Sequence, residues 1–287
     1  GLLFGSLINE QHIVRHAWRP ADMSKLFTES RSFFALDART GKLKWRYDAK
    51  KSLRHNAIAI GDGRVFLIDR TRAEIDLLNR AAQRKGKPLP PLKPHATGEL
   101  VCLDVKTGKR LWENPKDIFG TVLIFSEPHD MLLMSYQSTR FKLPSEVGGR
   151  MAVFRATEGY RVWDRKVDYI TRPLVNERSI ITQPSRLDLL TGEDEPWKFQ
   201  RSYGCGQLAG SKNLLLFRSA TVGYFDFTRE AGTENFGGVR PGCWINALPA
   251  GGLVFIPDAS AGCRCSYQNR SWVALEGSDE EVPSIRP

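Results

Sequence analysis

The chain of 287 residues has no run of about 20 apolar residues, the length that a membrane-spanning helix needs, so we expect no membrane span. It also lacks a Gly-x-Ser-x-Gly elbow, a His-Glu-x-x-His pair, a phosphate-binding glycine loop and a Cys-x-x-Cys-His haem motif. Its five histidines have no metal-ligand spacing. The apolar opening residues 1–10 have no basic start, so we do not expect them to be an export signal.

The composition is that of a globular, turn-rich protein with a basic surface. Hydrophobic residues make up 41%, and the chain contains 25 glycines and 16 prolines. Forty-two Lys and Arg against 32 Asp and Glu give a net charge of +10, which favours acidic partners. The basic residues are scattered and do not alternate with aromatic residues in a recognisable RNA-binding motif. We therefore expect no nucleic-acid partner.

An eleven-residue motif occurs twice, as "ALDARTGKLKW" over 35–45 and "CLDVKTGKRLW" over 102–112. The Asp-x-x-Thr-Gly core is typical of a hairpin turn, because Asp37 can accept hydrogen bonds from the turn amides and Gly41 tolerates a positive φ. Trp45 follows Gly41 by four residues, an even number, so the two residues lie on the same face of the outgoing strand. A large aromatic residue at that position predicts that each copy docks one sheet onto the next.

Weaker copies of the motif follow, at Gly159–Trp163 and at Asp188–Trp197, the second with one extra residue before its tryptophan. Strand–turn–strand segments lie between the copies, so each stretch of sequence supplies four short antiparallel strands. This pattern predicts an all-β protein, a β-propeller of four-stranded antiparallel blades, with about six blades or part-blades present. The predicted blade-docking residues are Trp45, Trp112, Trp163 and Trp197.

The predicted domain boundaries follow from this repeat. Residues 1–276 form the propeller, which we expect to be incomplete at both ends and part of a larger one. Two insertions, 71–97 and 138–149, interrupt the repeat, and the first has helical spacing over Thr71–Gly86. Residues 277–287 are acidic and lack strand periodicity, as expected of a linker or tail.

The Ala-x-Asp-x-x-Thr-Gly-x-x-x-Trp signature resembles the tryptophan-docking repeat of the quinoprotein (PQQ-like) propeller superfamily, which implies seven or eight blades in the intact protein. The segment from "GTENFGGVRPGCWINALPAGG" to "CRCSYQNRSWVAL" resembles PQQ-binding-like propeller proteins of planctomycetes, which implies a periplasmic or otherwise extracytoplasmic location. The superfamily includes quinone-dependent dehydrogenases and non-catalytic scaffolds such as an outer-membrane assembly lipoprotein. The resemblance therefore leaves the function open.

Four of the five cysteines lie in the last third of the chain, and the predicted blades bring them to one face near the channel mouth: Cys205, Cys243, Cys263 and Cys265. We rank two disulfides first, unlinked buried thiols second and a tetrathiolate metal site third. An exported protein favours disulfides, whereas Cys-x-Cys is tighter than the usual zinc spacing. Cys102 lies in a predicted strand and is interpreted as a small core residue.

By the same resemblance, a PQQ dehydrogenase would require a calcium site with acidic and amide ligands and an aspartate base. Enzymes of that family often also have a disulfide between two adjacent cysteines, and this sequence contains no Cys-Cys pair. The candidates to line the channel mouth, where innermost strands begin, are Arg54, His55, Asn56, Trp244 and Asn246. The alternative interpretation, which we favour, is that these side chains satisfy turns and pack between blades. The leading hypothesis is a non-catalytic extracytoplasmic scaffold that binds a protein, peptide or glycan. The alternative is an oxidoreductase with PQQ and calcium, completed by blades outside this chain.

Overall fold

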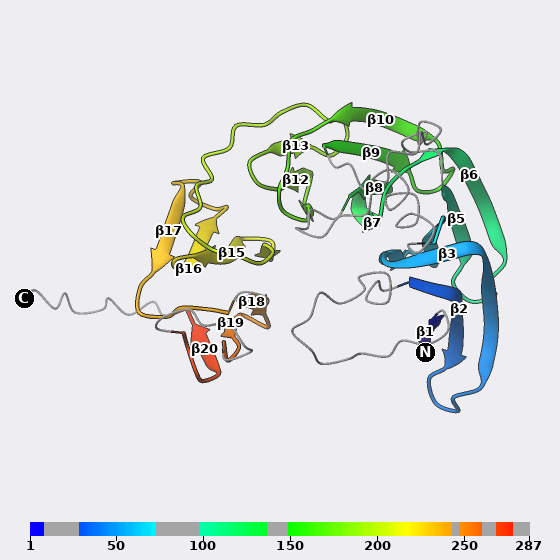
Figure 1. Cartoon of the computed structure of the whole chain (residues 1–287), viewed down its shortest axis with the longest axis horizontal. Coiled ribbons are helices and arrows are strands. Elements are labelled where there is room, and N and C mark those ends of the chain that lie inside the picture. The colour runs from blue at the N-terminus through cyan, green and yellow to red at the C-terminus, as the bar shows by residue number, and fades with distance from the viewer. Residues whose placement is uncertain (9–28, 73–97, 137–148, 243–246, 260–267, 278–287) are drawn as a thin grey trace, which may run out of the picture. The chain divides into compact units, whose positions relative to one another are not determined.

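The computed structural model describes residues 1–8, 29–72, 98–136, 149–242, 247–259 and 268–277 (Figure 1). Most of both predicted insertions, including nearly all of the predicted helix, lies outside the described residues. So do Trp244, Asn246, three of the four clustered cysteines and the tail. The chain divides into two units, one formed by Gly1–Ile170 with Leu187–Glu193 and the other by Thr171–Arg186 with Asp194–Pro287.

The first unit begins with a six-stranded antiparallel sheet in the order β1-β2-β3-β4-β5-β6. Its strands are β1 (Leu2–Ile8), β2 (Glu29–Asp37), β3 (Leu43–Gly61), β4 (Arg64–Arg70), β5 (Gly98–Asp104) and β6 (Arg110–Ile118). The 19-residue strand β3 pairs with β2 through its first half and with β4 through its second half. One strand therefore closes the first blade and opens the second.

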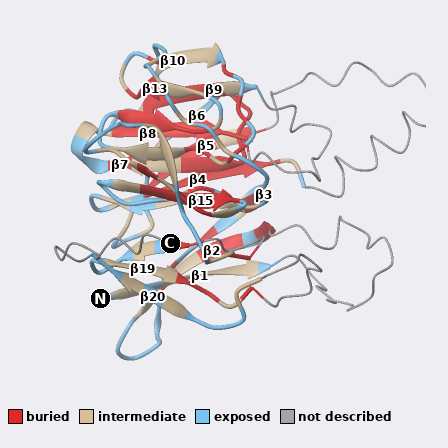
Figure 2. Ribbon diagram, turned by 90° about the vertical axis from the view of Figure 1, so that its left-hand side faces the viewer, coloured by how far each residue is buried: buried red, intermediate tan, exposed pale blue. Residues whose placement is uncertain are grey.

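The next blade of this unit is a four-stranded sheet in the order β10-β9-β8-β7. It contains β7 (Val122–Ser126), the short 3-10 turn η2 (Glu127–His129), β8 (Met131–Ser135), β9 (Arg150–Arg155) and β10 (Arg161–Lys166). The middle strands of the blades are almost wholly buried, and Figure 2 shows β4, β5 and β8 largely in the colour of buried residues. Consecutive apolar residues in these strands, VFLI in β4, LVCL in β5 and MLLM in β8, explain this, because both faces of a blade pack against a neighbour.

The second unit carries three further sheets, in the orders β11-β12-β13, β14-β15-β16-β17 and β18-β19-β20. The first comprises β11 (Leu174–Asn176), β12 (Ser179–Ile181) and β13 (Arg186–Asp188), of which Leu187 and Asp188 belong to the first unit. The second comprises β14 (Ala209–Gly210), β15 (Leu214–Ser219), β16 (Thr221–Asp226) and β17 (Thr233–Phe236). The third comprises β18 (Leu248–Ala250), β19 (Leu253–Ile256) and β20 (Val273–Glu276). Apart from η2, the described residues form no helix, and the predicted all-β architecture of antiparallel blades is confirmed.

The repeated motif forms a hairpin turn stabilised by its aspartate. Asp37 Oδ1 accepts hydrogen bonds from the backbone N–H of Thr40 at 2.9 Å, the Thr40 hydroxyl at 3.0 Å and the backbone N–H of Arg39 at 3.1 Å. These donors lower the pKa of Asp37 to about 2. Gly41 adopts φ 67°, a conformation that favours glycine.

Three tryptophans of the first unit each reach from the last strand of one blade to the hairpin turn of the next. Trp45 Nε1 donates to the Val105 carbonyl at 3.0 Å, Trp112 Nε1 to that of Ala156 at 3.1 Å, and Trp163 Nε1 to that of Leu189 at 2.9 Å. Each ring lies against a turn glycine, namely Gly108, Gly159 or Gly192. A Cβ on these glycines would lie 2.5 to 2.8 Å from the ring, so only glycine allows the approach.

Trp197 is placed differently. Its Nε1 donates to the Thr182 carbonyl at 3.2 Å, and its ring stacks on Phe199 and contacts Phe225, with centroids 5.4 and 4.7 Å apart. The following turn has no Thr-Gly pair and carries Phe227, whose ring also stacks on Trp197 at 6.4 Å. The indole of this blade is therefore part of an aromatic cluster and does not lie on a turn glycine.

Among the residues that the structure describes, no helix has the length and hydropathy to cross a membrane.

Candidate functional site

The described candidates for the channel mouth, Arg54, His55 and Asn56, lie in the middle of β3. They occupy the edge of the first unit at which β1, β4 and β8 end and β2, β5 and β9 begin. We call this edge the insertion edge, because the connections after Ile8, Arg70 and Ser135 leave from it. Trp244 and Asn246 lie outside the described residues, so the structure gives the positions of three of the five candidates, which lie together.

Arg54 is buried, with 5% of its surface exposed, and its guanidinium is bonded to the Glu29 carboxylate. The β2–β3 register places these two residues directly opposite each other. The Ser52 hydroxyl donates to the same carboxylate at 2.8 Å, and a second nitrogen of Arg54 donates to the Thr71 carbonyl at 3.3 Å. The guanidinium therefore holds the start of β2 and the residue that follows β4 to β3.

Asp69 fixes the course of β3 at the same edge, although nothing in the sequence marked it as important. Its carboxylate accepts hydrogen bonds from three successive backbone N–H groups, those of Lys50 at 2.5 Å, Lys51 at 2.9 Å and Ser52 at 3.0 Å. A buried carboxylate bonded to several N–H groups stabilises a locally irregular backbone. These bonds lie at the register shift of the β2–β3 pairing, between Asp48 and Leu53, just before β3 begins to pair with β4.

His55 shares hydrogen bonds with two serines of the same blade. Its Nε2 lies 2.6 Å from the Ser30 hydroxyl and 3.3 Å from the Ser6 hydroxyl. Ser30 is fully buried and pairs with Leu53 of β3. His55 thus connects β1, β2 and β3 within the first blade.

The described residues of the insertion edge do not fit PQQ with calcium. The Arg54 guanidinium is bonded to Glu29 and to the Thr71 carbonyl, and the 5% exposure of the residue leaves little of it to meet the carboxylates of a cofactor. His55 Nε2 is bonded to Ser30. Within the described ranges, no three His, Cys, Asp or Glu side chains come together as a metal-binding group.

A second polar network joins β6 to the outer hairpin of the next blade. Arg150 pairs with Asp117 and Asp164, and Arg161 donates to Asp164 at 2.9 Å and to Asp117 at 3.4 Å. Burial alone would raise the pKa of Asp117, but the hydrogen bond from Arg150 and the charges of both arginines lower it below its ordinary value. Asp117 also adopts φ 53°, so it turns the chain at the end of β6.

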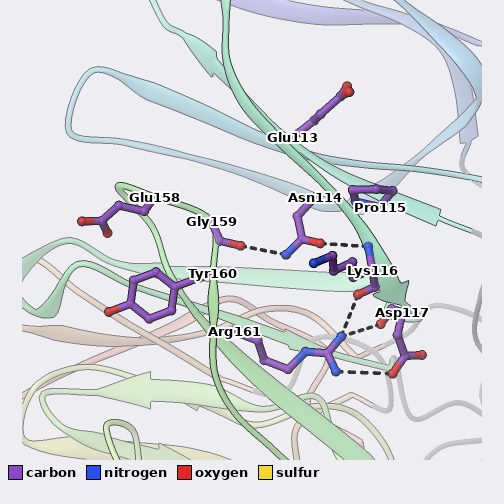
Figure 3. A pocket seen from close by; sticks show the side chains of 9 residues that line it. All are labelled: Glu113, Asn114, Pro115, Lys116, Asp117, Glu158, Gly159, Tyr160 and Arg161. Atoms are coloured by element: carbon purple, nitrogen blue, oxygen red, sulfur yellow. Dashed lines mark hydrogen bonds and ion pairs between the residues drawn. The ribbon is translucent and has the colours of Figure 1, made fainter.

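A groove of about 530 Å³ opens beside this network (Figure 3). Residues 113–117 of β6 form one wall and residues 158–161 of the β9–β10 turn form the other. The Asn114 amide donates to the Gly159 carbonyl at 2.8 Å and joins the two walls at the floor. Sequence reasoning missed this groove, because no single residue type in it carries a motif.

The two described cysteines differ in environment. Cys102 is fully buried in the core of the second blade, and Cys205 is an exposed free thiol. Arg201 donates to the Cys205 carbonyl at 2.7 Å and to that of Gly206 at 3.2 Å, which holds the loop that carries the thiol. The other three clustered cysteines lie outside the described residues, so the predicted disulfide pairing stays a prediction.

The comparisons with known proteins give a family and several similar folds. A family model described as outer membrane protein assembly factor BamB matches residues 9–172, more than half of the chain. No curated protein matches the sequence. Among solved structures, BamB from Moraxella catarrhalis is similar at 17% identity and a TM-score of 0.46, over 80% of this chain and 63% of that chain.

Two further structures give the same TM-score of 0.46. The computationally designed Ika8 protein is 13% identical over 79% of this chain and 62% of its own, and the Pan2 WD40 domain of Neurospora crassa is 10% identical over 80% and 70%. The chain thus spans less than two thirds of the length of BamB and of Ika8. On the extent of the family match, this chain belongs to the PQQ-like propeller family of outer membrane protein assembly factor BamB.

Proposed function

We propose that this chain is a non-catalytic scaffold of the BamB type, which works outside the cytoplasm and binds protein partners through its insertion edge. The family description, an outer membrane protein assembly factor, supports a role among proteins at the cell envelope. The observation that carries the proposal is that the candidate site residues Arg54 and His55 are bonded to residues of the neighbouring strands. Arg54 is bonded to Glu29 and His55 to Ser30, so these groups hold strand ends in place and do not present a reactive centre.

The insertion edge has the features of a binding surface on a rigid support. Three connections longer than a hairpin leave from it, and segments between strands commonly carry binding residues. The strand ends at this edge are fixed by the bonds of Arg54 and Asp69 and by Arg70, which donates to the Phe119 carbonyl at 3.0 Å. A fixed support lowers the entropy cost of forming a complex.

The charge at this edge favours a partner with an acidic surface. Arg31, Lys51 and Arg72 are exposed there. The whole chain carries a net charge of +10, which attracts acidic partners over long distances. We therefore expect the complex to weaken as the salt concentration rises.

Site-specific photo-crosslinking in the living source cell tests this proposal. A photoreactive phenylalanine analogue replaces Arg72 at the insertion edge in one variant and Lys106 in the exposed turn after β5 in a matched control. Discrete crosslinked protein bands from position 72, absent from position 106, are expected, together with recovery of the protein in the extracytoplasmic fraction. Crosslinks from position 106 alone would contradict the assigned surface.

A separate assay tests the absence of catalysis. The purified chain is incubated with PQQ and Ca²⁺, and dye-linked oxidation of alcohols and sugars is followed. No turnover above the cofactor blank is expected, and turnover that requires the protein would overturn the non-catalytic assignment.

A further inference from the structure

The groove between β6 and the β9–β10 turn, which we call the β6–β10 groove, is separate from the insertion edge and has no part in the proposed scaffold function. Its volume of about 530 Å³ falls in the range of small-ligand sites. All nine lining residues belong to the first unit: Glu113, Asn114, Pro115, Lys116, Asp117, Glu158, Gly159, Tyr160 and Arg161.

The walls of the groove are held in place before any ligand arrives. Asn114 donates to the Gly159 carbonyl, and the Trp112 indole packs against Gly159. A hydrogen bond to Tyr160 raises the pKa of Arg155 above its ordinary value and also restrains the tyrosine. A site formed by restrained groups loses less entropy when a ligand binds.

The free edge of β6 is blocked against the addition of another strand. Pro115 has no N–H, and the N–H of Lys116 is bonded to the Asn114 side chain at 2.8 Å. Arg161 donates to the Lys116 carbonyl at 2.7 Å and to the Asp117 carbonyl at 3.1 Å. An extended peptide that adds to a sheet edge needs these backbone groups, so the groove does not suit that mode of peptide binding.

The groups that face a ligand are one aromatic ring and several polar side chains. Tyr160 is 52% exposed, and both Glu158 and Lys116 are exposed. Figure 3 shows Tyr160 and Glu158 pointing to the same side of the groove, away from the pair formed by Arg161 and Asp117. Pro115 adds an aliphatic ring to the lining, so the groove combines apolar ring surface with polar side chains.

The charge of the lining disfavours an anion. Three carboxylates, those of Glu113, Asp117 and Glu158, face two cations, those of Lys116 and Arg161, which leaves a formal charge of −1. The Arg161 guanidinium is already bonded to Asp117 and to Asp164. Phosphate and carboxylate ligands, which require an available guanidinium or several ammonium groups, are therefore poor candidates.

We propose that the β6–β10 groove binds a short, uncharged oligosaccharide, with one sugar ring stacked on Tyr160 and its hydroxyls hydrogen-bonded to Glu158 and Lys116. A tyrosine ring offers a flat apolar body to the C–H face of a sugar. Carboxylate oxygens accept hydrogen bonds from hydroxyls, and ammonium groups donate hydrogen bonds to them. A half-exposed aromatic ring among polar groups matches the alternating apolar faces and polar rims of a sugar chain.

Calorimetric titration with defined tetrasaccharides tests the proposal. The neutral probes are cellotetraose and chitotetraose, and tetragalacturonate is the anionic control. The variants are Tyr160→Ala and the matched control Tyr203→Ala, which removes a tyrosine of comparable exposure (64%, against 52% for Tyr160) outside the groove. Thermal unfolding followed by circular dichroism shows whether each variant is folded, and Tyr160→Phe retains the ring if the alanine variant is not.

We expect at least one neutral tetrasaccharide to bind, with tetragalacturonate binding more weakly. Loss of the ring in Tyr160→Ala should weaken binding by roughly tenfold, whereas Tyr203→Ala and Tyr160→Phe should leave it nearly unchanged. Three results would overturn the proposal: no binding of either neutral probe up to about 10 mM, binding that survives Tyr160→Ala, or a preference for tetragalacturonate. None of these results bears on crosslinking at the insertion edge.

Discussion

The Trp112 indole lies so close to Gly159 of the next blade that a Cβ on this glycine would be 2.5 Å from the ring. Gly159 also adopts φ 75°, so two independent constraints require glycine there. Gly41 occupies the same position in the turn of the first blade, with φ 67°, but nothing lies within 4 Å of its Cβ position. An alanine at Gly41 therefore has only the free-energy cost of the positive φ, whereas an alanine at Gly159 also has the cost of steric overlap with the indole.

We expect Gly159→Ala to destabilise the chain much more than Gly41→Ala. A positive φ costs an alanine about 1–2 kcal/mol, and forced overlap in a packed site adds about 1–3 kcal/mol. Urea denaturation of both variants measures the difference in the free energy of unfolding. Equal losses would mean that the Trp112 ring moves aside without cost, and that the contact contributes little to joining the blades.

This relationship was accessible from sequence because it depends on local spacing. A Thr-Gly turn and a tryptophan four residues later specify a hairpin and the face on which the indole lies. Trp197 departs from the pattern at the position where the sequence also departs, with one extra residue before it and Phe227 in the next turn. The prediction nevertheless treated Trp197 as a docking residue like the other three, although its local sequence differs from theirs.

The insertion edge was not accessible in the same way. The pairing of Glu29 with Arg54 depends on register shifts at Ser30/Ser32 and at Ala35/Leu36, and counting residues from the turn does not reveal such bulges. Asp69 bonds to backbone N–H groups. Almost every residue type has such a group, so the sequence does not show which residues Asp69 will bind. The β6–β10 groove brings together residues more than 40 positions apart, so its lining has no motif.

Glu29 should be far more important for stability than an exposed acidic residue of the same sheet. Its pair with Arg54 has side chains only 6% exposed, and removal of one partner of a buried pair costs about 3–5 kcal/mol. The matched control is Asp48→Asn, since the Arg46–Asp48 pair is 42% and 64% exposed and is worth less than about 1 kcal/mol. Urea denaturation of Glu29→Gln and Asp48→Asn compares the two.

A double variant separates the cost of leaving a buried charge unpaired from the contribution of the Glu29–Arg54 pair itself. Replacement of both partners by apolar residues, Glu29→Leu with Arg54→Met, should destabilise less than Glu29→Gln, because no buried charge is left unpaired. If the double variant is the less stable one, the pair itself contributes most of the stability of this edge.

Asp37 should make stability depend on pH in the acid range. Its pKa is lowered from 3.8 to about 2 by the backbone and hydroxyl groups of Thr40 and by the backbone N–H of Arg39. Because the folded-state pKa is below the unfolded one, the ionised group stabilises the fold above about pH 4, and this contribution is lost as pH falls toward 2. The stability advantage of the wild type over Asp37→Asn should therefore shrink between pH 5 and pH 2.

The variant Thr40→Val removes the hydroxyl that donates to Asp37 and keeps the Asp37 carboxylate. It should bring the pKa of Asp37 back toward 3.8, which a carboxyl-carbon NMR titration measures directly. An advantage over Asp37→Asn that stays constant across this pH range would show that the turn does not depend on the charge of Asp37.

The two described cysteines should differ sharply in reactivity. Burial raises the pKa of the Cys102 thiol to about 12, so at pH 8 roughly one molecule in 10⁴ carries its thiolate, and no surface of Cys102 is exposed to reagent. Cys205 is exposed and free. Iodoacetamide should therefore modify Cys205 in the folded chain within minutes and Cys102 only after unfolding, as peptide mass spectrometry shows.

The same labelling decides among the alternatives for the cysteine cluster. Protein isolated from its source cells is alkylated with and without prior reduction. Rapid labelling of Cys205 without reductant is expected from the exposed thiol, and it would exclude a disulfide at that residue. If labelling of Cys205 requires reductant, then Cys205 is paired in the cell, and the peptide attached to it identifies which of Cys243, Cys263 and Cys265 is its partner. Protection that persists after reduction and ends with a chelator would indicate a bound metal, because a thiolate metal site loses its ion to the chelator and a disulfide does not.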